Sequence, residues 1–126
     1  MLGNLSERID QVLQLSIATE QRRVRRLTDA QQLEATRQAM LDAAAERVAQ
    51  AIALVGSATA DQDAGLLDPR RTALDTARGQ FVAAALAHRD AVARRNSEWR
   101  SLEVAQRTRR RMERLRILRE RRNGGA

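Results

Sequence analysis

The chain of 126 residues contains no cysteine and no lysine, and it has only one proline, six glycines and two aromatic residues, Phe81 and Trp99. Without cysteine the protein can form neither disulfide bonds nor thiolate metal sites. Much of its apolar content is alanine, which buries little area compared with the roughly 1.5–3 kcal/mol gained by a buried leucine, valine or phenylalanine side chain. Strong helix formers, mainly alanine, leucine, arginine, glutamine and glutamate, dominate instead. This composition is typical of long helices and coiled coils.

The chain also lacks a long apolar run. The longest run, residues 81–87, has seven residues and is mostly alanine, whereas a membrane-spanning helix needs about 20. Residues 1–7 show no basic region followed by an apolar stretch, so we expect no secretory signal and a cytoplasmic protein.

Two long stretches flank a short segment rich in glycine, serine, threonine and aspartate, and their only helix breakers are Pro69 at the start of the second stretch and Gly79 within it. The pattern predicts a helix over residues 4–57, a turn over 58–68 and a second helix over 69–122. Asp68 is expected to be the N-cap of the second helix, with Pro69 at its first position. Equal arms with a short connection fold back on each other. The sequence therefore predicts a single all-α domain, residues 1–126, forming an antiparallel two-helix coiled-coil hairpin.

The apolar residues define the expected contact between the arms. In the first arm, steps of three and four residues from Leu27 onward form a heptad pattern. In the second arm the expected stripe contains Leu74, Ala77, Phe81, Ala84, His88, Ala91, Trp99, Leu102, Ala105, Met112, Leu115 and Leu118. Glu20, Arg23, Glu34 and Arg37 also fall on the stripe of the first arm, so we expect looser packing there. Folding back near Gln62 places Val48 opposite Ala77.

The positive charge is concentrated in one part of the sequence. Residues 94–122 hold twelve arginines and four acidic residues, a charge of +8, whereas residues 1–93 hold eleven arginines and twelve acids, a charge of −1. Such a basic block indicates an acidic partner, whether protein, nucleic acid or lipid headgroup. At the open end of the hairpin, where the two chain ends meet, further arginines of the first arm would lie near the block.

Two interpretations of these arginines remain open. They can form a solvated helix surface with pairs such as Glu103–Arg107, or they can bind an acidic partner, since the acids nearby are too few to neutralise them. The planar guanidinium is suited to bidentate contacts with carboxylate or phosphate. The block consists of Arg107, Arg109, Arg110, Arg111, Arg114, Arg116, Arg119, Arg121 and Arg122, and the arginines of the first arm expected near it are Arg22, Arg23, Arg25 and Arg26.

Trp99 and His88 have two interpretations each. Trp99 can belong to the core or can project outward, since tryptophan and arginine together are typical interface anchors. His88 and Phe81 share a face, either as part of the stripe or as a docking strip. No nucleophile or acid accompanies His88, and no glycine-rich phosphate loop is present. We therefore expect a protein that is not an enzyme and has no catalytic residues, cofactor, metal or small-molecule substrate.

Both ends of the chain carry a recognisable pattern. Leu5, Ile9, Val12, Leu13 and Leu15 precede residues 21–27 at the start, and Glu98-Trp99-Arg100 leads through Ala105 to residues 109–115 and 118–122 at the close. This pattern, with the overall length and the two-helix architecture, resembles the FliJ family of flagellar export proteins and the YscO-type proteins of injectisome type III secretion. Residues 35–95 carry nothing diagnostic, and the absence of lysine departs from typical members.

The resemblance implies a cytoplasmic stalk that is peripherally associated with the inner face of the cell membrane. Family members place the open end of their coiled coil in a hexameric export ATPase and contact the membrane export gate protein with another surface; some escort export chaperones. Carried over to this chain, the resemblance implies that nine residues face the ATPase, namely Trp99 and eight arginines: Arg22, Arg23, Arg25, Arg26, Arg109, Arg110, Arg111 and Arg114. Leu74, Phe81 and His88 would face the gate.

The alternative to a stalk is an arginine-rich hairpin that binds nucleic acid with the same open end. This interpretation predicts an affinity that falls steeply with salt as counterions are released. Aromatic residues for stacking on single strands are missing, which favours the stalk.

Overall fold

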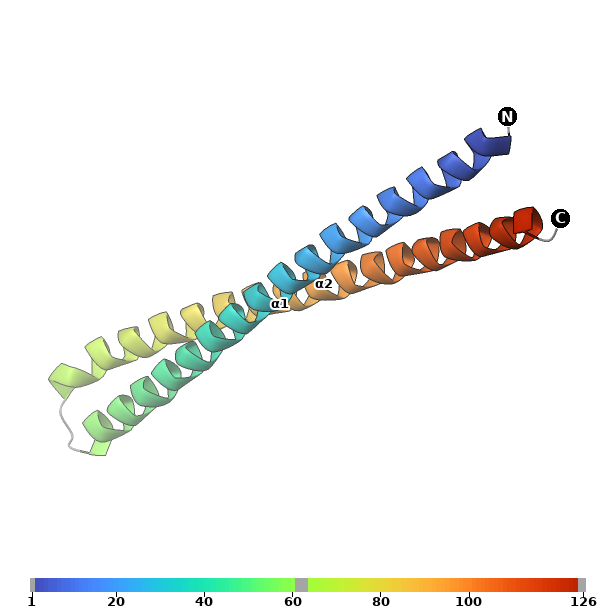
Figure 1. Cartoon of the computed structure of the whole chain (residues 1–126). Coiled ribbons are helices and arrows are strands. Elements are labelled where there is room, and N and C mark those ends of the chain that lie inside the picture. Colours follow the sequence, from blue (N-terminus) through green and yellow to red (C-terminus); the bar gives the residue numbers. More distant parts are fainter. Residues whose placement is uncertain (1, 61–63, 125–126) are drawn as a thin grey trace. The chain divides into compact units, whose positions relative to one another are not determined.

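The computed structural model describes residues 2–60 and 64–124, and this part of the chain consists of two α-helices without any strand. Helix α1 runs from Leu2 to Ala60 and helix α2 from Ala64 to Gly124. The two helices pack against each other in opposite directions (Figure 1). The predicted all-α, antiparallel two-helix hairpin is therefore confirmed.

Both helices extend further toward the connection than the sequence predicted. Of the expected turn at residues 58–68, residues 61–63 lie outside the described residues, and the remainder is helical. Burial explains the difference, because Ala58 is almost fully buried and Leu67 is half-buried. These two side chains prolong the contact between the helices, and this contact outweighs the weak helix propensity of the glycine, serine and aspartate around them.

Pro69 lies inside α2, so the prediction of Asp68 as N-cap and Pro69 as first helical residue is wrong. Pro69 is the sixth residue of a helix that begins at Ala64. Only the first four N–H groups of a helix lack an internal acceptor, so Pro69 removes one hydrogen bond that another residue would donate to the Gly65 carbonyl. The cost is confined to one turn near the helix end.

The chain divides into two units, each built from a segment of α1 and a segment of α2. Met1–Ala30 and Arg95–Ala126 form one unit, called here the terminal unit, and Gln31–Arg94 forms the other, called the loop unit. The terminal unit contains 16 arginines and 8 acidic residues, and the loop unit contains 7 arginines and 8 acidic residues. The two ends of the chain thus belong to the same unit, and this unit carries the excess positive charge.

In the loop unit the helices meet through small apolar side chains. Ala51, Leu74 and Ala77 form a buried cluster, and Val48 and Val55 pack against it. This cluster agrees with the predicted pairing of Val48 and Ala77. The small residues allow the two backbones to approach closely, and Leu74 fills the space between them. Near the connection, the Arg70 guanidinium donates a hydrogen bond of 2.8 Å to the Leu54 carbonyl and joins the two helices.

In the terminal unit the buried apolar residues alternate with polar ones. Leu13, Leu27, Ala30, Leu102 and Ala105 are buried. Between them, at the same three- and four-residue spacing, lie half-buried Glu20, Arg23, Arg95, Glu98 and Arg109. Ser16 is buried as well, and its hydroxyl donates to the Val12 carbonyl at 2.9 Å. The looser packing predicted around Glu20 and Arg23 thus corresponds to a polar seam between the helices.

We predict weaker amide protection in the terminal unit than in the loop unit, because polar seam residues contribute less burial free energy than apolar ones. Hydrogen exchange followed by mass spectrometry should show faster exchange around Leu13 and Met112 than around Ala44 and Phe81. Uniformly slow exchange along both helices would contradict this prediction.

Candidate partner-binding surface

The polar seam of the terminal unit is organised by Arg109. This residue of α2 donates one hydrogen bond from Nε to Glu20 of α1, and a second from a terminal nitrogen to Glu113 Oε1 at 2.8 Å. The side chains of Arg109 and Glu20 are only 25% and 17% exposed. The hydrogen bonds that Arg109 donates, first to Glu20 and then to Glu113, raise its pKa above the ordinary range. Arg109 therefore stays charged and joins the two helices.

Arg116 repeats this arrangement one heptad later, nearer the chain ends. Its Nε lies 3.2 Å from Glu120 Oε1 on the same helix and 3.8 Å from Asp10 Oδ1 on α1. These side chains are half or more exposed, so the contacts stabilise the fold less than those of Arg109. Both arginines are neutralised by carboxylates that lie on the same side of the seam.

That side of the seam is called here the acidic edge. It is formed by residues that recur at heptad spacing: Asp10, Ile17 and Val24 of α1, and Trp99, Glu113 and Glu120 of α2. Residues of both helices line one shallow hollow on this side: Ile17, Glu20 and Val24 of α1, and Arg109 and Glu113 of α2. The acidic edge thus combines exposed apolar side chains with the carboxylates that pair with Arg109 and Arg116.

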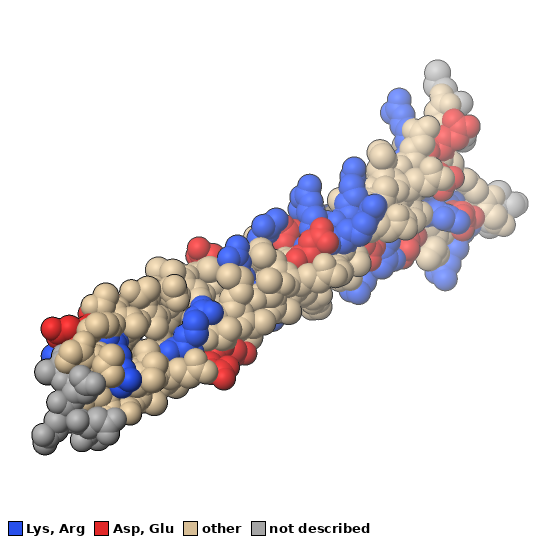
Figure 2. Space-filling model, turned by 90° about the vertical axis from the view of Figure 1, so that its left-hand side faces the viewer, with Lys and Arg blue, Asp and Glu red and all other residues tan. Residues whose placement is uncertain are grey.

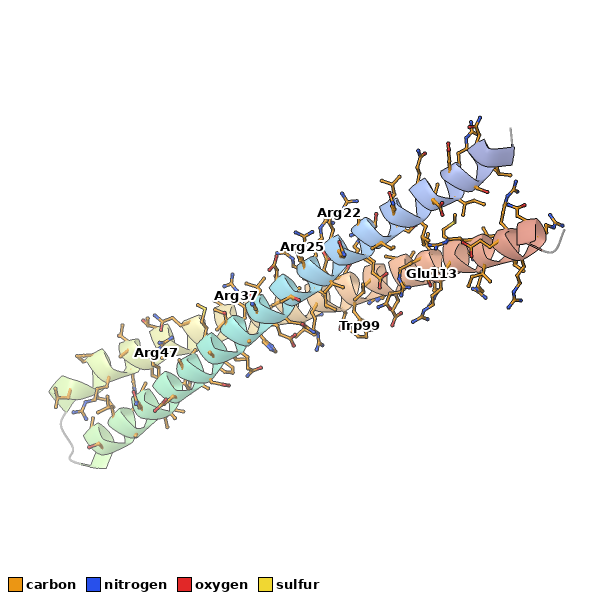
Figure 3. All side chains as sticks on the ribbon, viewed as in Figure 1. Arg22, Arg25, Arg37, Arg47, Trp99 and Glu113 are labelled. Atoms are coloured by element: carbon orange, nitrogen blue, oxygen red, sulfur yellow. The ribbon has the colours of Figure 1, made fainter. Side chains whose placement is uncertain are left out.

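Trp99 is 51% exposed, so its expected place in the core stripe is wrong, and the alternative that it projects outward is correct. The seam of α2 passes from Leu102 back to Glu98 and Arg95, which leaves Trp99 beside it (Figure 3). Near the C-terminus, too, the seam differs from the predicted stripe. Arg116 and Arg119 occupy the seam positions there, and Leu115 and Leu118, predicted for the stripe, are about half exposed.

Most of the predicted arginines are accessible to a partner. Six of the eight are exposed: Arg22, Arg25, Arg26, Arg110, Arg111 and Arg114. Arg22 and Arg25 project from α1 into solvent (Figure 3), and Arg22 donates a hydrogen bond of 3.2 Å to the Thr19 hydroxyl. The other two differ, because Arg23 is half-buried in the seam and Arg109 is held by Glu20 and Glu113. Figure 2 shows basic side chains standing out from the surface, with acidic groups beside only some of them.

The three residues predicted to face a membrane export gate all lie on the seam of the loop unit. Leu74 is buried in the cluster with Ala51 and Ala77. It stabilises the helix pair and offers almost no surface to a partner. His88 is half-buried, and Phe81 is 37% exposed. Only Phe81 and His88 therefore offer part of their surface to a partner.

The sequence pattern was not used to identify the charged residues of α2 that lie in the seam. Glu20 and Arg23 were recognised on the stripe, but Arg109 was assigned to the surface block, and the stripe of the second arm was drawn through Trp99 instead of Glu98. Counting back from Leu102 and forward from Ala105 in steps of three and four would have placed Glu98 and Arg109 on the seam. Within the described residues, Glu98 Oε2 and Arg119 Nε are buried without a hydrogen-bond partner, which is a further source of weak packing.

The described residues show no group of three metal-ligating side chains that could hold an ion. Neither α1 nor α2, over residues 2–60 and 64–124, contains a segment apolar enough to cross a bilayer. Comparison of the chain with protein-family models, with curated proteins and with solved structures finds no match.

Proposed function

We propose that the protein is a non-enzymatic coiled-coil stalk of a flagellar or injectisome type III export apparatus. In this proposal the terminal unit binds the hexameric export ATPase. Another surface, which includes Phe81 and His88, contacts the membrane export gate protein, and export chaperones are a third class of partner. The protein would act in the cytoplasm, at the inner face of the cell membrane.

The observation that carries the proposal is the excess of exposed arginine in the unit that contains both chain ends. This unit has twice as many arginines as acidic residues, and the carboxylates of the acidic edge pair mainly with Arg109 and Arg116 in the seam. Arg110, Arg111 and Arg114 remain exposed. The two ends of the sequence resemble the FliJ and YscO-type proteins, and this resemblance implies a stalk. The form expected of such a stalk is an antiparallel hairpin with a basic end.

Replacement of Arg110, Arg111 and Arg114 by glutamine is expected to weaken binding to the cognate export ATPase at least tenfold. These side chains are exposed, so their loss removes charge without disturbing the seam, and charged contacts of this kind set association rate and affinity. Binding should be measured by surface plasmon resonance, and ATP hydrolysis by the purified ATPase should be followed with and without the stalk.

The matched control replaces three exposed arginines of the loop unit on the same helix, Arg71, Arg78 and Arg89, by glutamine. It removes the same charge and should change ATPase binding less than twofold. Equal losses in the two variants would show a non-specific charge effect. If the unaltered protein neither binds the ATPase nor changes its hydrolysis, but binds nucleic acid with a steep salt dependence, the nucleic-acid alternative replaces the stalk.

A further inference from the structure

The side of the terminal unit opposite the acidic edge carries an apolar depression between the helices. Val12 and Leu15 of α1 and Val104 of α2 line a hollow of about 270 Å³. Leu115 and Leu118 line a second hollow of about 580 Å³ together with Ile9. All five flanking residues, Val12, Leu15, Val104, Leu115 and Leu118, are 42–65% exposed. They are called here the apolar trough.

Heptad spacing places the two hollows on one side of the seam. Val104 and Leu118 are two heptads apart, and Leu115 follows Thr108 of the first hollow by one heptad. In a supercoiled helix, residues at this spacing share a face. The trough therefore follows α2 for at least the distance from Val104 to Leu118, roughly 21 Å at 1.5 Å per residue. This length corresponds to about four helical turns.

The trough is bordered by arginines rather than by carboxylates. Arg8, Arg22 and Arg26 of α1 and Arg111 and Arg122 of α2 each lie one or two heptads from a residue lining the trough, and all five are exposed. Within the described residues, none of the five has an ion pair to a carboxylate. The only carboxylate at these heptad positions of the terminal unit is Asp29, one heptad beyond Arg22.

The two sides of the same helix pair thus differ in charge. On the acidic edge, Asp10, Glu113 and Glu120 pair with seam arginines. On the trough side, the five exposed arginines form no ion pair with a carboxylate among the described residues, and they flank leucine and valine side chains. A purely solvated surface would not need contiguous apolar residues between unpaired arginines, and exposed apolar patches rimmed by charge mark interaction sites.

From this segregation we infer that the apolar trough is a docking site for an acidic amphipathic helix of a partner protein. Such a helix would lay an apolar stripe against Val12, Leu15, Val104, Leu115 and Leu118. Glutamate or aspartate on both sides of the stripe would pair with the bordering arginines. The bound helix would convert the two-helix pair into a three-helix arrangement, which is the helix-in-groove mode of recognition. The inference does not depend on the proposed stalk function.

The test uses the full chain and a synthetic probe. The probe is a fluorescein-labelled helical peptide of about 15 residues, with leucines at three- and four-residue spacing and glutamates flanking them. Fluorescence anisotropy should show saturable binding. Binding should be lost with a peptide of the same composition in scrambled order, and with one in which lysine replaces glutamate. Equal binding of the scrambled peptide would overturn the inference, because charge alone would then explain the affinity.

Val104→Glu places a negative charge in the trough and should weaken binding of the peptide about tenfold, or about 1.4 kcal/mol. Its matched control is Ile117→Glu on the same helix, which should change binding less than twofold. Val104 is 59% exposed and Ile117 is 49% exposed, so both variants should keep the helicity of the unaltered chain by circular dichroism. Equal weakening by the two variants, or no weakening by either, would overturn the inference.

The same variants distinguish two other occupants of the apolar trough, a lipid surface and a second copy of the chain. Binding to vesicles containing phosphatidylglycerol that is lost in the Val104→Glu variant, without binding to the peptide, would assign the trough to lipid and overturn the inference. Self-association that depends on Val104 in sedimentation would assign it to a second copy, with the same consequence. The peptide assay contains no export ATPase, so a negative result in it does not contradict the stalk proposal. Failure to bind the ATPase likewise does not contradict binding of the peptide.

Discussion

Replacing Leu74 by alanine should lower the free energy of unfolding by about 2–4 kcal/mol. Leu74 is 8% exposed and forms the buried cluster of the loop unit with Ala51 and Ala77. Its neighbours in the cluster are small, so they cannot move in to fill the space that a leucine leaves. Since domains are stable by only about 5–15 kcal/mol, this loss is a large fraction of the total. Urea denaturation followed by circular dichroism at 222 nm would measure it.

The control for this prediction is Leu86→Ala on the same helix. Leu86 is 56% exposed, so the same truncation there removes little buried area and should change the stability by less than about 0.5 kcal/mol. If Leu74→Ala and Leu86→Ala had the same small effect, Leu74 would not be a core residue and the pairing of the helices in the loop unit would be wrong.

Replacing both Glu20 and Arg109 by leucine should raise the melting temperature by several degrees. The two side chains are largely enclosed between α1 and α2, and the free energy lost in desolvating a partly buried ion pair often exceeds what its attraction returns. Leucines at these seam positions would continue the apolar contact between Leu13 and Leu27 on α1 and between Leu102 and Met112 on α2. Differential scanning calorimetry of the unaltered and doubly substituted chains would measure the change.

The single variant Arg109→Leu should instead lower the melting temperature, because it leaves the Glu20 carboxylate in the seam without its cation. A second control replaces Glu103 and Arg107, an exposed pair at 4.0 Å, by glutamine; no change is expected there. A double variant that is destabilised as much as Arg109→Leu alone would show that the ion pair stabilises the hairpin more than leucines do.

The effect of Arg109 should not depend on pH in the range where the protein is handled. Its pKa in the folded chain is raised by the hydrogen bonds to Glu20 and Glu113. The stabilisation linked to a raised pKa is fully present below the unfolded value and is lost only as the pH rises through the folded value. Both values lie in strongly alkaline solution, so Arg109 holds the two helices together as a permanent charge rather than as a switch.

The polar seam has a consequence for the alignment of the helices. Alanine contacts such as those in the loop unit change little when one helix slides by a turn. Arg109 contacts carboxylates on both helices, and Arg116 does the same one heptad later. A slide of one turn would separate Arg109 from Glu20 and leave both charges in the seam without each other. We infer that these contacts specify the register of the terminal unit.

The helical class, the fold-back and the excess of positive charge near the C-terminus followed from the sequence alone, because each depends on composition and on local spacing. The absence of glycine and proline over most of both arms permits long helices. The steps of three and four from Leu27 to Val55 require a second helix as a partner. Even the weak stretch around Glu20 and Arg23 could be located from the pattern, since both residues interrupt an apolar stripe.

Only the tertiary structure decided which side of the seam each remaining residue occupies. Trp99 and Glu98 are neighbours in the sequence and differ in their position around the helix by about 100°, so the stripe of α2 could be drawn through either one. Packing against α1 selected Glu98. The same choice placed Val104, Leu115 and Leu118 in the apolar trough and put the carboxylates of Glu113 and Glu120 on the acidic edge. Sequence spacing fixes how residues follow one another around a helix, but the neighbouring helix determines which of them face inward.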